Sequence, residues 1–164
     1  MKKPIKIMFF AVGGTIDKVY FDRLSAYKVG DPGVSEILSE ANVSFLYEFE
    51  SILRKDSLYM TEKDRQAVYE RVAAEENRHI VITHGTDTMV KTAKKLKSIH
   101  GKVIVLTGAM QPARFKSSDA EFNIGAAAAA VQLLPEGVYI VMNGLVLDPD
   151  KVKKNRRLNR FEEK

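Results

Sequence analysis

Short apolar runs that alternate with helix-like segments constrain the fold of this chain more than any other feature. The apolar runs cover residues 5–12, 43–49, 79–83, 103–106 and 138–142. Segments with a helical character cover residues 34–41, 62–77, 87–98 and 119–134. Strands that alternate with helices pair in parallel and are joined by right-handed crossovers. The sequence therefore predicts an α/β fold, a three-layer α/β/α arrangement around a mostly parallel sheet.

Two segments have local features that the periodicity does not cover. The helix after residue 61 has a clear start signal, because Thr61 is a suitable N-cap and Asp64 completes a capping box three residues later. Residues 17–33 mix charged and apolar positions with glycine and proline, and we expect them to form a long loop.

Composition limits the classes of protein to which the chain can belong. Its 164 residues are predicted to form one domain. It has no cysteine, which excludes disulfides, thiolate metal sites and a cysteine nucleophile, and fits a cytoplasmic location. The three histidines are scattered singly, so no metal and no cofactor are expected. No apolar run reaches 18 residues, so no membrane contact is expected.

The net charge of +5 is located at one end of the chain. Residues 151–164 contain seven lysines and arginines and two glutamates, whereas residues 1–150 are neutral overall. A basic segment of this kind is either a solvated tail or a contact for nucleic acid. We expect a solvated basic tail, and nucleic acid is the less favoured partner.

Three of the predicted strands end in loops of glycine and threonine. The loops are Gly13-Gly14-Thr15, the segment 83–88 (THGTDT) and Thr107-Gly108-Ala109. In an open α/β sheet, ligands bind outside the carboxyl ends of the strands. If the sheet is parallel, all three loops lie at that edge, and their glycines allow a ligand to approach the backbone. The sequence therefore predicts a ligand site there.

At these loops the chain resembles the bacterial-type asparaginase/glutaminase family. Its two threonine motifs are matched by Gly13-Gly14-Thr15-Ile16 and by residues 84–89 (HGTDTM). Further matches are Thr107-Gly108-Ala109-Met110, residues 118–124 (SDAEFNI), and residues 25–30 (SAYKVG), which resemble the loop that carries the family's catalytic tyrosine. The resemblance implies the flavodoxin-like or Rossmann-like fold of the asparaginase N-terminal domain. It also implies an amidohydrolase that converts L-asparagine, or a related amide, to the acid and ammonia.

The family's catalytic residues can be carried over to matching positions. Thr15 corresponds to the nucleophile, and Tyr27 to the loop tyrosine that helps to deprotonate or orient it, although Tyr20 is a competitor for that role. Thr86, Asp87 and a lysine form the second catalytic cluster in the family. Lys151, Lys153 and Lys154 are available, and the family pattern selects Lys154.

The resemblance also implies a substrate pocket for a small-molecule amide. Its expected members are Gly14, Ser57, Gly85, Thr86 and Asp87. Asp87 corresponds to the residue that holds the substrate's α-amino group, and Ser57 to the one that holds its α-carboxylate. Leu58 and Tyr59 depart from the family, which has a polar residue at this point. His84 is expected to be structural.

The match covers only the larger, N-terminal domain of the usual two-domain family member, so the single domain spans 1–164 with residues 151–164 as its tail. In the family, a neighbouring subunit's C-terminal domain completes each site. We therefore expect a homodimer or a higher even oligomer, with the tail near the partner's pocket. Two alternatives remain open: a weak or inactive binding module for ligands like asparagine or aspartate, and an amidase that acts on a different amide.

Overall fold

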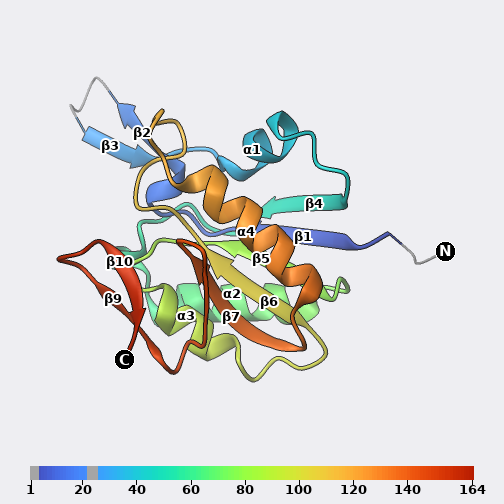
Figure 1. Ribbon diagram of the computed structural model, residues 1–164. Coiled ribbons are helices and arrows are strands. Elements are labelled where there is room, and N and C mark those ends of the chain that lie inside the picture. Colours follow the sequence, from blue (N-terminus) through green and yellow to red (C-terminus); the bar gives the residue numbers. More distant parts are fainter. Residues whose placement is uncertain (1–3, 22–25) are drawn as a thin grey trace.

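The computed structural model describes residues 4–21 and 26–164, and a six-stranded sheet forms its centre (Figure 1). Its strands lie in the order β4-β1-β5-β6-β7-β8. The first five are parallel, and β8 pairs antiparallel with β7. Their bounds are β4 Leu46–Ser51, β1 Lys6–Ala11, β5 His79–Thr83, β6 Val103–Thr107, β7 Gly137–Met142 and β8 Leu145–Leu147. The parallel part has the flavodoxin-like order 2-1-3-4-5.

Four helices cover the two faces of the sheet, and the predicted three-layer fold is confirmed. They are α1 (Val34–Glu40), α2 (Glu62–Ala74), α3 (Met89–Leu96) and α4 (Ala120–Leu133). Helices α2 and α3 pack on the face that holds Phe10, whereas α1 and α4 pack on the face that holds Phe9 (Figure 1). Alternate residues of β1 thus enter two separate cores, which explains why this strand is apolar throughout.

The predicted elements agree with the structure closely, with small shifts at their ends. Strand β4 begins three residues later than predicted, and α2 ends three residues earlier. The predicted capping box is confirmed: Thr61 Oγ1 accepts the Asp64 N–H at 3.2 Å, and Asp64 Oδ2 accepts the Thr61 N–H at 2.8 Å. Capping satisfies N–H groups that the first helical turn leaves without partners.

The prediction of a long loop over residues 17–33 was wrong. A short 3-10 helix, η1 (Thr15–Asp17), is followed by β2 (Lys18–Phe21) and β3 (Ala26–Val29), which pair antiparallel with Tyr20 opposite Tyr27. Aromatic and β-branched residues favour extended backbone here, and the glycines that suggested a loop follow the second strand. Residues 22–25, which include Ser25 of the tyrosine-loop resemblance, lie outside the described residues.

The prediction of a solvated tail over residues 151–164 was also wrong. This segment forms a hairpin of β9 (Val152–Asn155) and β10 (Arg160–Glu163). Val152 and Phe161 are only 1% and 3% exposed and belong to the same core as α2 and α3. The charge count did not reveal these two buried apolar residues, because the lysine and arginine residues next to them in the sequence dominate it and are exposed.

In the described part of the chain, no helix combines the length and the apolar character that a membrane span requires.

Candidate active site

Both hairpins lie on the side of the sheet where the parallel strands end, at the left of Figure 1. This edge includes the topological switch point of the sheet, which lies at β1. The chain continues from β1 to β4 on one side of β1, and then crosses to β5 on its other side. The chain turns sharply after β1, where Gly13 and Gly14 have φ values of +106° and +97°. Only glycine adopts such angles without strain.

The three predicted glycine loops meet at this edge. A Cβ on Gly14 would stand 2.4 Å from the Gly85 Cα, and a Cβ on Gly85 would stand 2.6 Å from the Ser57 Cβ. A Cβ on Gly108 would stand 2.3 Å from the His84 carbonyl oxygen. The loops after β1, β5 and β6 are therefore packed backbone against backbone, and any side chain at these glycines would force them apart.

The loop after β6 is held in place by two residues of the 118–124 motif. Asp119 accepts the Met110 N–H at 3.0 Å, and the Asn123 side chain donates to the Gly108 carbonyl at 2.9 Å. Asn123 is fully buried. The 118–124 motif thus holds the loop after β6 in position.

Lys154 reaches the second threonine motif from the other side of the site. Its Nζ donates to Thr86 Oγ1 at 2.7 Å and to Asp87 Oδ1 at 3.0 Å. Lys153 instead lies 3.8 Å from Glu162, and Lys151 is exposed. The hairpin therefore brings Lys154, of the three candidate lysines, to Thr86 and Asp87.

The segment around η3 (Ser57–Tyr59) forms another wall of the site. Ser57 is 1% exposed and packs on Gly85, whereas Leu58 and Tyr59 are 58% and 77% exposed. The Ser57 carbonyl oxygen accepts a hydrogen bond from the Thr88 hydroxyl at 2.9 Å. Ser57 thus ties this segment to the second threonine motif, and the apolar side chains after it face solvent.

Asp56, immediately before η3, carries a stabilised negative charge. Burial opposes its ionisation, but Lys18 Nζ at 2.8 Å and the Leu58 N–H at 3.1 Å outweigh that effect. The pKa of the Asp56 carboxyl is therefore lowered. The Lys18 contact links this segment to β2.

Tyr27 and Tyr20 both belong to an aromatic cluster on the β2–β3 hairpin. The Tyr27 ring centroid lies 5.4 Å from that of Tyr20 and 5.8 Å from that of Phe115. Tyr27 also lines a cavity of about 510 Å³ together with Arg54 and Tyr59. Tyr27 thus lies at the wall of the site that η3 forms, and its ring contacts are with Tyr20 and Phe115, not with Thr15. Thr15 is half-buried at the start of η1.

His84 is fully buried and has a partner for each ring nitrogen. Its Nδ1 lies 2.7 Å from the Gly85 carbonyl oxygen, and its Nε2 lies 2.8 Å from the Thr92 hydroxyl. A carbonyl oxygen only accepts, so Nδ1 carries the proton and Nε2 accepts from Thr92. Burial lowers the pKa of His84 to about 4. These contacts are consistent with the structural role expected for it.

Asp17 is a buried residue of this region that the sequence analysis missed. Its side chain accepts the Gly33 N–H at 2.8 Å, and its carbonyl accepts the Gly30 N–H at 2.7 Å. Burial raises the pKa of Asp17 to about 6, although the Gly33 hydrogen bond and the charges of Arg54 and Arg114 oppose this. The sequence signal that could have identified Asp17 is a charged residue only two positions after the Gly-Gly-Thr motif.

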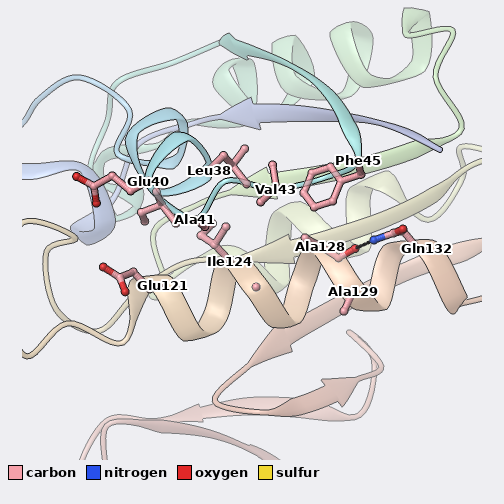
Figure 2. A pocket seen from close by; sticks show the side chains of 12 residues that line it. Leu38, Glu40, Ala41, Val43, Phe45, Glu121, Ile124, Ala128, Ala129 and Gln132 are labelled. Carbon is pink, nitrogen blue, oxygen red and sulfur yellow. Dashed lines mark hydrogen bonds between the residues drawn. The ribbon is translucent and has the colours of Figure 1, made fainter. Parts of the chain in front are cut away.

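A separate cavity of about 360 Å³ lies between α1 and α4 (Figure 2). Leu38, Val43, Phe45 and Ile124 form its apolar walls, and the carboxylates Glu40 and Glu121 lie at one end. None of the predicted site residues lines it. Among the described residues there is also no group of three or more histidines, cysteines and carboxylates that could hold a metal ion.

Comparison with known proteins assigns the chain to a family. The family model for the N-terminal domain of asparaginase matches residues 6–162. The chain belongs to the asparaginase family. It is 32% identical over 160 residues to a probable periplasmic L-asparaginase of Haemophilus influenzae, which covers 90% of this chain and 46% of that protein. It is 44% identical over 79 residues to L-asparaginase 2 of Escherichia coli, over 45% of this chain and 23% of that protein.

Solved structures of asparaginases show the same fold. The thermostable L-asparaginase from Thermococcus kodakarensis superposes with a TM-score of 0.83 at 27% identity, covering 97% of this chain and 51% of that one. L-asparaginase I from Vibrio cholerae gives a TM-score of 0.84 at 25% identity, with 98% and 52% covered. The chain therefore spans about half the length of these asparaginases, or less than half in the case of the curated relatives.

Proposed function

We propose that this chain hydrolyses the side-chain amide of L-asparagine or a related small molecule, with Thr15 as the nucleophile. The observation that supports the proposal most strongly is the cluster of Thr86, Asp87 and Lys154 beside the loop that carries Thr15. The cluster stands at the carboxyl edge of the sheet, where ligands of this fold class bind.

The proposed reaction proceeds through a covalent intermediate. The Thr15 Oγ attacks the amide carbon, and its proton passes to a base, because a threonine hydroxyl is a weak nucleophile until it is deprotonated. The C–N bond then breaks, the nitrogen takes up a proton, and ammonia leaves. Water attacks the acyl-threonine ester, which releases the acid and restores Thr15. Tyr27 is the proposed aid to deprotonation in the first step.

The remaining site residues have supporting roles in this scheme. Lys154 donates to Thr86 Oγ1 at 2.7 Å and to Asp87 Oδ1 at 3.0 Å, and it thereby orients the Thr86 hydroxyl and the Asp87 carboxylate. Backbone N–H groups near Gly14 and Gly85 are the proposed donors to the oxyanion, an interaction worth roughly 3–4 kcal/mol per donor. Ser57 contributes through its packing on Gly85, and its contact with a substrate carboxylate stays a prediction.

The test is ammonia release from L-asparagine, L-glutamine and N-substituted amides, with Thr15→Ala as the inactive control. Release that depends on Thr15 supports the proposal. Saturable binding of these ligands without release by the wild-type protein would instead favour a binding module. The exposed Leu58 and Tyr59 favour an amide other than free asparagine as a second candidate substrate, since apolar side chains suit a larger ligand.

We also propose a cytoplasmic homo-oligomer. The absence of cysteine and the likeness to a probable cytoplasmic L-asparaginase of Campylobacter jejuni, at 28% identity over 97% of this chain and 53% of that one, support the location. Phe122, Leu145 and Val146 are 63%, 50% and 49% exposed, and such apolar side chains suit a contact between copies. Sedimentation at micromolar concentration tests the oligomer, and a monomer would contradict it.

A further inference from the structure

We propose that the cavity between α1 and α4 is a second binding site, and that it takes a small primary amine whose nitrogen is joined to an aliphatic or aromatic group. The apolar group fills the cavity, and the ammonium lies beside the carboxylates of Glu40 and Glu121 (Figure 2). None of the residues proposed for catalysis lines this cavity. The inference therefore goes beyond the proposed amidohydrolase function and does not depend on it.

The size and the walls of the cavity suit a small molecule. Its volume of about 360 Å³ is at the lower end of the range of roughly 300–1,000 Å³ that is usual for ligand pockets. Leu38 and Ile124 are only 2% and 1% exposed, so part of the wall belongs to the core of the protein. The ring of Phe45 lines the cavity and stacks on that of Phe9, with 6.3 Å between the centroids. These packed side chains give the cavity a fixed apolar wall.

Gly125 leaves part of this space open. It lies inside α4 and lines the cavity, and a Cβ built on it would meet no atom within 4 Å apart from its own helical turn. Glycine inside a helix is less favourable than alanine, because its backbone loses more conformational freedom on folding. The helix thus has no side chain at a point where one could be accommodated, and the space is available to a ligand.

Two carboxylates give the cavity a charged end. Figure 2 shows Glu40 and Glu121 together at this end, away from Phe45 and Gln132. In the part of the chain that the structure describes, neither glutamate takes part in an ion pair. Glu40 is also the last residue of α1, which has no basic residue in its last turn. Negative charge is unfavourable at a helix C-terminus, so a cation beside Glu40 is stabilised by the helix as well as by the carboxylates.

The basic residues of this region do not cancel the negative charge. Arg114 and Lys116 line a second hollow of about 440 Å³ that shares Glu40 and Glu121 with the cavity, but neither of them lines the cavity itself. Glu36 lines the second hollow as well, so the carboxylates there outnumber the cations. Apolar walls with excess negative charge at one end are complementary to an amine that carries an apolar group, and they repel a carboxylate of the same shape.

The experiment compares three ligands that share one phenylethyl group. They are phenethylamine, which is protonated at pH 7, the neutral 2-phenylethanol and the anionic 3-phenylpropionate. Calorimetric titration of the full chain gives the dissociation constant of each. We expect phenethylamine to bind at least about tenfold more tightly than 2-phenylethanol, because hydrogen bonds to charged groups are about twice as strong as neutral ones. The acid should bind most weakly.

Variants assign the binding to the cavity. Combined Glu40→Gln and Glu121→Gln should remove most of the preference for the amine over the alcohol. Glu76→Gln is the matched control, because Glu76 is exposed and does not line the cavity. Gly125→Leu should fill the cavity and weaken the binding of phenethylamine at least about tenfold, whereas Gly125→Ala should retain the binding and raise the melting temperature. The charge variants decide the question even if Gly125→Leu does not fold.

Three results would overturn the inference. The first is that phenethylamine does not bind, or binds no more tightly than 2-phenylethanol. The second is that the double glutamate variant and Glu76→Gln behave alike. The third is that sedimentation finds an oligomer for the wild type and a monomer for Gly125→Leu, because a second copy of the chain would then cover the cavity. If no amide is hydrolysed but phenethylamine binds as expected, the proposed function fails and the amine site stands.

Discussion

Replacement of Asp17 by asparagine is predicted to stabilise the protein at neutral pH. Asp17 is 4% exposed, and burial raises the pKa of its carboxyl from 3.8 to about 6. Each pKa unit corresponds to 1.36 kcal/mol, so the shift amounts to about 3 kcal/mol of unfolding free energy. An asparagine is never charged, and its Oδ1 can still accept the Gly33 N–H. Asp17→Asn therefore removes the charge and keeps the hydrogen bond.

The sign follows from the proton count in each state. Between pH 3.8 and about 6, the folded protein holds the Asp17 proton while the unfolded chain has released it. Stability contributed by this residue therefore falls as the pH rises through that interval, and it is lowest above pH 6. Asp17→Asn should be more stable than wild type by up to about 3 kcal/mol near pH 8. The difference should shrink toward zero near pH 4.

The assay is urea unfolding of both proteins at several pH values. Burial lowers the pKa of His84 to about 4, and this residue gives a slope of opposite sign, because its stabilising contribution is lost as the pH falls from 6.5 toward 4. His84 is present in both proteins, so the difference between them isolates Asp17. The exposed Asp31 is the control, and Asp31→Asn should change stability by less than about 1 kcal/mol at every pH. A variant of Asp17 that is less stable than wild type at pH 8 would refute the reasoning.

Four further predictions concern the site and its supports. Thr15→Ala should reduce ammonia release at least about a thousandfold while the melting temperature stays nearly constant, and activity within tenfold of wild type would contradict a nucleophilic role. Lys154→Met should lower kcat at least about a hundredfold, whereas Lys151→Met at an exposed position should not. Gly14→Ala should destabilise the fold far more than Gly101→Ala, because both have positive φ but only Gly14 lies against backbone; thermal unfolding compares them. Phe161→Ala should lower the unfolding free energy by about 3–5 kcal/mol, since its ring is buried in the core.

The sequence predicted the parts of the fold that repeat a simple pattern. All five apolar runs became parallel strands, and the glycine loops after β1, β5 and β6 meet as expected, because parallel strands place their carboxyl ends at one edge. The two hairpins were missed for a physical reason. In each, the pattern is only four residues long per strand, and Val152 and Phe161 are single anchors within a basic stretch.

The contacts between site residues that are far apart in the chain could not be predicted from the sequence. The family pattern selected Lys154, but its contacts with Thr86 and Asp87 depend on the docking of β9 against the core. Asp17 was overlooked because it is buried against Gly30 and Gly33, which follow a hairpin that was expected to be a loop. Tyr27 was chosen for its motif, and its actual neighbours are rings of Tyr20 and Phe115 that the motif does not contain.

The position of Lys154 in the chain also has a consequence during protein synthesis. Thr15 leaves the ribosome well before Lys154, because Lys154 lies on a hairpin that is made after β7 and β8. The first strands and helices can begin to fold while the amine that completes the cluster is still absent. The proposed nucleophile is therefore made before the proposed cluster is complete. We expect hydrolytic activity to arise only late, after Val152 and Phe161 enter the core and Lys154 contacts Thr86.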